Sequence, residues 1–213
     1  MTWSFDVAKR QYVDGERTVT QAELIALRNT VANGMADEAE TLAQRLISGA
    51  ISLVEWAKAF AALIRNGIAA GFLLGRGGRS QIDRAALTLL DTLIGAQLDY
   101  AKGFATELAP SLTAGTATAE GVAARSSLYA GASVQAFDQG RAQAWSLDLP
   151  YYPADGQTSC GGNCRCEWSI DNLDDRIEAT WHTEGDGKVC DGCRARGNKY
   201  GPGSPFVQRK DAT

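Results

Sequence analysis

The sequence contains a single histidine, His182, among its 213 residues. Catalytic pairs of histidine with serine or cysteine, and metal sites built from several histidines, would all depend on this one residue. The sequence also lacks the Gly-Lys-Ser/Thr element of a P-loop, a His-Glu-x-x-His motif and a Gly-x-Ser-x-Gly motif. Because no set of residues suggests nucleophilic or general acid–base catalysis, we predict that the protein is not an enzyme.

An excess of positive charge and a long apolar run are absent as well. Acidic residues outnumber basic ones by 25 to 21, which gives a net charge of −4 and disfavours a protein that coats nucleic acid. The best apolar stretch, residues 67–74, is too short to span a bilayer. Residues 1–6 lack the basic region and apolar run of a signal peptide. We therefore expect no contact with a membrane.

The composition changes near Leu149. Residues 1–148 hold one proline, Pro110, and no cysteine, whereas residues 149–213 hold four prolines and all five cysteines. We predict three parts: a helical domain over 1–148, a metal-binding β-hairpin module over 149–200, and an extended basic tail over 201–213.

Two capping boxes mark the start of helices in the first part. In each, a hydroxyl side chain at the N-cap is followed three positions later by glutamate: Thr20 with Glu23, and Ser52 with Glu55. Apolar residues then recur at helical spacing, to Gly49 in the first helix and to the glycines at 75–78 in the second. We expect Asn33-Gly34 to break or bend the first helix.

Two further helices complete the predicted first part. Ser80, supported by Asp83, is expected to cap a third helix, and Pro110 is expected to end that region. A fourth helix is expected over about 118–144. Long amphipathic segments with short connections predict a mainly α fold, either a helical bundle or an elongated helical arm.

The second part changes to strand periodicity. Residues 167–170 and 177–182 each favour a strand, and the polar residues 171–176 form a turn between them. Thiols stand just outside both ends of this predicted hairpin: Cys160, Cys164 and Cys166 before it, and Cys190 and Cys193 after it. Because a hairpin brings its outer ends together, we expect the cysteines before it and the cysteines after it to converge on one point.

Converging thiols across a hairpin are typical of a zinc ribbon, in which four thiolates enclose a structural zinc ion. We favour this reading over a redox or purely structural role for the thiols. Cys190 and Cys193 are the firmest candidates, and Cys160 with Cys164 forms the most natural second pair. Cys166 is either a buried apolar thiol on the strand face or a ligand in place of Cys164. We predict that His182 is a surface residue of the strand rather than an additional ligand. We also predict that the loop over 75–79 is a connection between helices rather than an anion-binding site.

Several motifs resemble the C-terminal zinc module of the minor head proteins of tailed phages and prophages, the head-morphogenesis proteins of the SPP1 and Mu F-like type. The residues that carry the resemblance are Tyr151-Tyr152-Pro153-Ala154-Asp155-Gly156, Asn163-Cys164-Arg165-Cys166, Trp168, Ala179-Thr180-Trp181, and Cys190 with Cys193. Helical motifs at 46–49, 52–56, 76–78 and 125–130 occur in similar order there. Many members place a Cys-x-x-Cys pair before the Asn-Cys-Arg-Cys element, with a histidine two positions before its asparagine. Here the order is reversed and position 161 is glycine, which makes an all-thiolate site the expectation.

The resemblance implies a structural virion protein at the portal or inner capsid wall, acting in head assembly or DNA packaging. It implies the portal or major capsid protein as partner, packaged DNA as a further contact, several copies in a particle, and a location in the virion and, during assembly, in the host cytoplasm.

The alternative is a nucleic-acid-binding zinc-ribbon protein. Five basic residues between Arg194 and Lys210, against no acidic residue there, favour it.

The prolines and glycines of 201–205 cannot continue a helix or a central strand. We therefore expect 201–213 to be extended, and ordered only where another chain or packaged DNA holds it.

Overall fold

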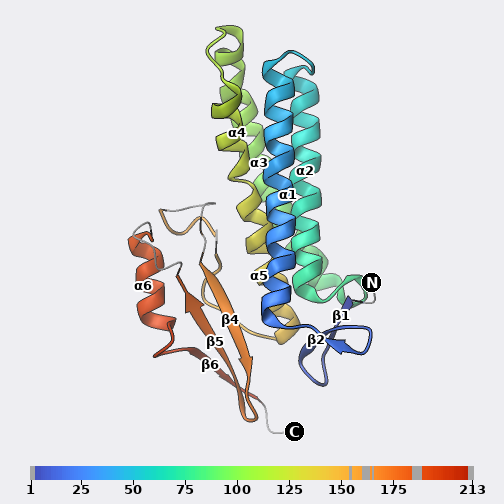
Figure 1. The fold of residues 1–213 in the computed structure, drawn as a ribbon, viewed down its shortest axis with the longest axis vertical. Helices are drawn as coiled ribbons and strands as arrows, with labels where there is room; N and C mark the ends of the chain where they lie inside the picture. The colour runs from blue at the N-terminus through green and yellow to red at the C-terminus, as the bar shows by residue number, and fades with distance from the viewer. Residues whose placement is uncertain (1–2, 154, 160–163, 165, 184–188, 211–213) are drawn as a thin grey trace.

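The computed structural model describes residues 3–153, 155–159, 164, 166–183 and 189–210. Long helices stand side by side, a small N-terminal sheet lies at their foot, and a second sheet with a short helix lies beside the lower part of α5 (Figure 1). The helices are α1 Gln21–Ile47, α2 Leu53–Arg76, the 3₁₀ turn η1 Arg79–Gln81, α3 Arg84–Thr113, α4 Ala119–Ser127, α5 Ala130–Trp145 and α6 Asp191–Tyr200. The strands are β1 Trp3–Asp6, β2 Gln11–Asp14, β3 Arg17–Thr18, β4 Glu167–Asn172, β5 Arg176–His182 and β6 Phe206–Arg209. The predicted class, a mainly α fold followed by a small β module with a cysteine cluster, is confirmed.

Both predicted capping boxes form. The Thr20 hydroxyl accepts the Glu23 amide, and the Glu23 carboxylate accepts the Thr20 amide at 2.8 Å. Ser52 and Glu55 make the same pair of bonds at the start of α2. The expected break at Asn33-Gly34 is wrong, because α1 runs through it without interruption. A helical glycine costs only about 1 kcal/mol, which the packing of a long helix offsets.

The third helix differs from the prediction at both ends. It is Asp83, not Ser80, that caps α3, and the Asp83 carboxylate accepts the Ala86 amide at 2.7 Å. Ser80 lies in η1. Pro110 does not end the helix, which continues to Thr113. The proline removes one hydrogen bond where only one further turn follows, so little helix is lost.

The predicted single helix over 118–144 is two helices joined at an elbow. Amides at the elbow bond three residues back instead of four: Tyr129 to Ser126 at 3.2 Å, Gly131 to Leu128 at 3.2 Å, and Ala132 to Tyr129 at 3.1 Å. This is the tighter 3₁₀ pattern, and a mid-helix stretch of it often marks a functional hinge. No proline causes it.

Helices α2 and α5 meet almost backbone to backbone. A Cβ atom added at Gly75 would lie 2.0 Å from the Phe137 carbonyl oxygen, and one added at Gly140 would lie 2.4 Å from the Phe72 carbonyl oxygen. No side chain could occupy either position at this separation. These glycines therefore fix the approach of α5 to α2.

Helix α2 is the central helix of the bundle core. Its apolar stripe is completely buried against the neighbouring helices: Trp56, Phe60, Ile64, Ile68 and Phe72. By length and composition alone, α2 is also long and apolar enough to cross a membrane. The burial of the stripe is the pattern of a core helix.

The N-terminal strands form an antiparallel sheet in the order β1-β2-β3 that was not predicted. Phe5 and Tyr12 face each other across it and are buried against Trp145 at the end of α5. The Tyr12 hydroxyl bonds to the Gly75 carbonyl of α2. The sheet therefore closes the foot of the helices.

The second sheet has the order β4-β5-β6. The predicted hairpin is present, with Glu167 opposite His182 and Asn172 opposite Ile177. Strand β6 adds to β5, with Phe206 opposite Ala179. The expectation that the tail is ordered only by another chain is therefore wrong for 206–209, because β5 offers a free edge within the same chain. Residues 211–213 lie outside the described part.

Two clusters of buried residues form the core. One lies within the helical bundle. The other contains Phe5 and Tyr12 of the N-terminal sheet, Trp145 of α5, and Trp168 and Trp181 of the C-terminal module. The N-terminal sheet thus shares its core with the cysteine module.

Candidate metal centre

The β4–β5 hairpin positions the thiols. Cys166 immediately precedes β4, and Cys193 lies in the first turn of α6, which follows β5. The pairing of Glu167 with His182 closes this end of the hairpin. Residues that are far apart in the sequence are thereby brought to one end of the sheet.

Three sulfur atoms meet at that end. The sulfurs of Cys164, Cys166 and Cys193 all lie within 4.8 Å of one another, and the Cys164 and Cys193 sulfurs are 3.6 Å apart. That separation is far longer than a disulfide bond of about 2.05 Å. All three side chains are buried, with Cys193 only 1% exposed. Three sulfurs this close in a dry environment are placed to hold a metal ion.

The electrostatics of the cluster fit a cation. The hydrogen bond with the Cys164 thiol, followed by burial, raises the pKa of the Cys166 thiol far above its usual range. Without a cation the Cys166 thiol therefore stays protonated. A divalent ion reverses this preference, because it draws thiolates to itself and releases their protons. Three buried, soft sulfur donors suit a metal that prefers thiolate ligands.

The start of α6 contributes a fourth thiol nearby. Cys190 is the N-cap, and its sulfur accepts the backbone N–H of Cys193 at 3.4 Å. A helix N-terminus carries partial positive charge, which favours negative charge on a sulfur at that position. Cys190 is partly exposed and is not among the three clustered sulfurs.

The predicted residues can now be placed. Cys164, Cys166 and Cys193 come together, so Cys166 lies in the cluster beside Cys164 and does not merely pack in the apolar core. Cys160 lies outside the described residues. His182 is partly exposed, and its ring bonds to the Ser169 hydroxyl across the hairpin at 2.8 Å, while Trp181 beside it is buried.

A buried ion pair on α5, where the bundle meets the module, was missed by sequence reasoning. Asp138 and Arg141 on α5 are 3.1 Å apart, with side chains 0% and 1% exposed. Burial, more than any neighbour, raises the pKa of Asp138, and Arg141 opposes that rise. Arg141 also donates a hydrogen bond to the carbonyl oxygen of Trp168 on β4. The only sequence signal was two charges one turn apart within a helix of small residues.

Further polar contacts fasten the module to the helices. Arg28 of α1 lies 3.4 Å from the Glu167 carboxylate, and the Gln21 amide reaches the Trp168 carbonyl at 3.3 Å. The Gln208 amide of β6 bonds to the Ser146 carbonyl at 2.7 Å. Both edges of the second sheet are therefore tied to the helical part.

The three clustered thiols are buried, come from two segments of one small module and could hold a metal ion. A hydrogen bond from the buried Arg141 fastens this module to the bundle. Comparisons with protein-family models, with curated proteins and with solved structures found no match for this chain.

Proposed function

We propose that the cysteine cluster holds a structural zinc ion. The observation that carries this is the convergence of three buried sulfurs, within 4.8 Å, from both sides of the β4–β5 hairpin. Structural zinc takes four ligands in a closed site, and the fourth comes from Cys190 or Cys160. When bound, the ion supplies a cross-link that the module needs, since a sheet this small has little core of its own.

We further propose that the protein is a structural component of a tailed-phage head, at the portal or the inner capsid wall. The support is the order of the motifs around the thiols and along the helices, together with the long helical part of the chain. The expected partner is the portal or major capsid protein. We expect several copies of the present protein in each particle. The role would be head assembly or DNA packaging.

The alternative, a nucleic-acid-binding zinc-ribbon protein, has weaker support because three of the five C-terminal basic residues are engaged within the chain. Arg196 pairs with the Asp155 carboxylate at 3.1 Å and is buried. Arg194 donates to the Val189 carbonyl at 3.3 Å, and Lys210 donates to the Leu173 carbonyl. Side chains held this way are less available to phosphates.

Metal analysis tests the first proposal. Chelator-free protein should carry about one zinc per chain, and Cys193→Ser should lose it, whereas Ser169→Ala on the adjacent strand should retain it. Metal content near zero, with every thiol titrating freely, would contradict the zinc site.

Particle association tests the second proposal. The protein should co-sediment with virions or portal–capsid assemblies, and Cys190→Ser should impair its incorporation. A salt titration of DNA binding addresses the alternative, since phosphate contacts weaken steeply as salt rises. Absence from purified particles, together with salt-sensitive DNA binding, would favour the alternative.

A further inference from the structure

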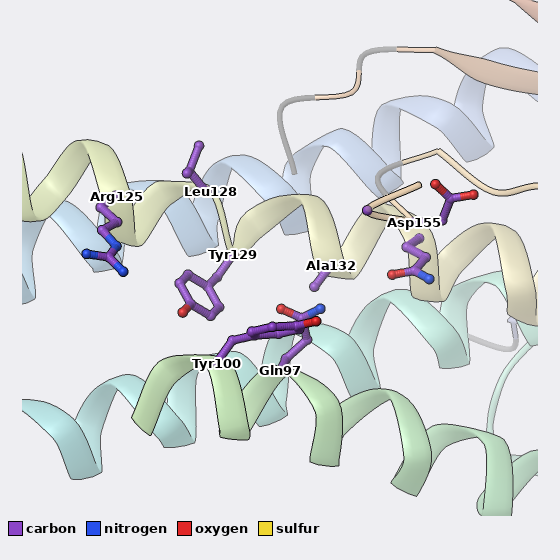
Figure 2. A pocket seen from close by; sticks show the side chains of 9 residues that line it. Gln97, Tyr100, Arg125, Leu128, Tyr129, Ala132 and Asp155 are labelled. Carbon is purple, nitrogen blue, oxygen red and sulfur yellow. The ribbon is translucent and has the colours of Figure 1, made fainter. Parts of the chain in front are cut away.

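A cleft of about 310 Å³ opens at the elbow between α4 and α5. We call it the elbow cleft, and its polar and aromatic lining is Gln97, Tyr100, Arg125, Tyr129, Gln135 and Asp155. Figure 2 shows Tyr100 and Gln97 rising from α3 toward Tyr129 and Ala132 on the opposite wall. The cleft lies next to the 3₁₀ turn between α4 and α5, so the elbow shapes its wall.

Four hydrogen-bonding side chains in the elbow cleft are uncommitted. Within the described part of the chain, no hydrogen bond engages the amides of Gln97 and Gln135 or the hydroxyls of Tyr100 and Tyr129. Burial raises the pKa of Tyr129, so its hydroxyl remains a donor at neutral pH. The ring of Tyr129 is held edge-on against Phe60, with centroids 5.0 Å apart. The cleft therefore offers uncommitted hydrogen-bond donors beside aromatic rings, of which the Tyr129 ring is anchored.

The charges at the two ends of the cleft are already neutralised. Arg125 pairs with the Glu107 carboxylate at 2.5 Å and lies over the Phe104 ring. Asp155 pairs with Arg196 at 3.1 Å. A ligand with phosphate groups would find no uncompensated cation here. The lining instead fits an uncharged ligand that presents hydrogen-bond acceptors and apolar surface.

We propose that the elbow cleft binds a proline-containing extended segment of a partner protein. A polyproline II segment leaves its carbonyl oxygens free to accept hydrogen bonds, and such segments dock in grooves lined by aromatic side chains. The wall runs from Arg125 on α4, past the elbow, to Gln135 on α5, so it offers an elongated surface rather than a single point of contact. The exposed ring of Tyr100, 68% accessible, and the anchored ring of Tyr129 supply the two faces.

This inference does not depend on the zinc site or on the virion role, because none of the residues that it uses is a cysteine. The test uses the full-length protein and fluorescein-labelled decaproline, with a labelled Gly-Ser decapeptide of equal length as the control probe. Fluorescence anisotropy should show saturable binding of decaproline alone. Tyr100→Ala should weaken it about tenfold or more, as loss of a central aromatic contact does.

Two variants sharpen the test. Tyr100→Phe keeps the ring but removes the hydroxyl donor, so it should weaken binding by roughly threefold. Leu87→Ala changes another exposed side chain of α3 that lies outside the cleft, and it should leave binding unchanged. Circular dichroism should show the same helical content in all variants, because both positions are exposed.

Three results would overturn the proposal: no saturable binding of decaproline at millimolar concentration, equal binding of the Gly-Ser peptide, or undiminished binding by Tyr100→Ala. An oligothymidine probe tests the competing ligand class. If it bound more tightly than decaproline and lost affinity in Tyr100→Ala, the cleft would be a base-stacking site and the peptide assignment would be wrong.

Discussion

Arg141, in the C-terminal half of α5, donates a hydrogen bond to the carbonyl oxygen of Trp168, two residues beyond Cys166. The guanidinium is held in place by Asp138 one turn earlier on the same helix. A single buried side chain therefore connects the helical bundle to the strand that begins at the thiol cluster.

Removing the carboxylate of this pair should be costly. Asp138→Ala leaves the Arg141 guanidinium buried without its partner, so we expect the free energy of unfolding to fall by about 3–5 kcal/mol. Glu107→Ala breaks the exposed pair with Arg125 and should cost less than about 1 kcal/mol. Urea titration of both variants measures the difference. If both variants lost the same free energy of unfolding, the buried pair would contribute no more to stability than the exposed pair.

The close approach of α2 to α5 predicts opposite effects for two helical glycines. Gly75→Ala should destabilise the protein by about 1–3 kcal/mol, because the new Cβ would collide with the Phe137 carbonyl. Gly95→Ala on α3 meets no atom within 4 Å and should stabilise by about 0.5–1 kcal/mol through helix propensity. Thermal unfolding compares them. A neutral Gly75→Ala would mean that the helices separate easily.

Removal of the proposed zinc ion should disrupt the packing of the core that contains the thiols and leave the core of the helical bundle intact. The Trp168 and Trp181 rings stack edge to face, with centroids 5.1 Å apart, in the core that contains the thiols. After chelation we expect the near-ultraviolet circular dichroism of these rings to collapse. The far-ultraviolet helical signal should persist, because the bundle has a separate core. An unchanged near-ultraviolet spectrum after complete removal of zinc would contradict this.

The capping box of α1 predicts a pH dependence. The Thr20 backbone N–H, followed by Arg17, lowers the pKa of Glu23 to about 2. The folded state therefore binds this proton less readily than the unfolded chain, whose glutamate pKa is about 4.3. Stability from Glu23 is present above about pH 4.3 and is lost as the pH falls toward 2. Wild type should unfold at a higher temperature than Glu23→Gln at pH 7, and this gap should close near pH 2. A gap that did not change with pH would exclude the carboxylate as its source.

Elements with strong local chemistry were predictable. The boxes at Thr20 and Ser52 started their helices as expected, because both bonds of a capping box form between residues three positions apart. The hairpin and the convergence of Cys164 with Cys193 followed from strand periodicity and the placement of thiols outside the strands. In each case the contacts that form the element join residues close in sequence or on the two sides of one β-hairpin.

Features set by distant packing were not predictable. The elbow at Leu128 and Tyr129 contains no proline, and the Tyr129 ring packs on Phe60 of α2. Strand β6 forms because β5 leaves an edge open, which the proline-glycine segment before it does not reveal. The inward turn of Arg141 depends on a carbonyl 27 positions away. Such contacts exist only once the helices and the second sheet are together.

The close contact of α2 and α5 at Gly75 and Gly140 also has a mechanical consequence. Where two helices touch through backbone atoms, no side-chain rotation can absorb a displacement, so a push on one is passed directly to the other. Helix α5 in turn holds β4 through Arg141. The long helices and the cysteine module should therefore move together as a stiff lever, and a force applied at the far tip of the helices would be felt at the thiols.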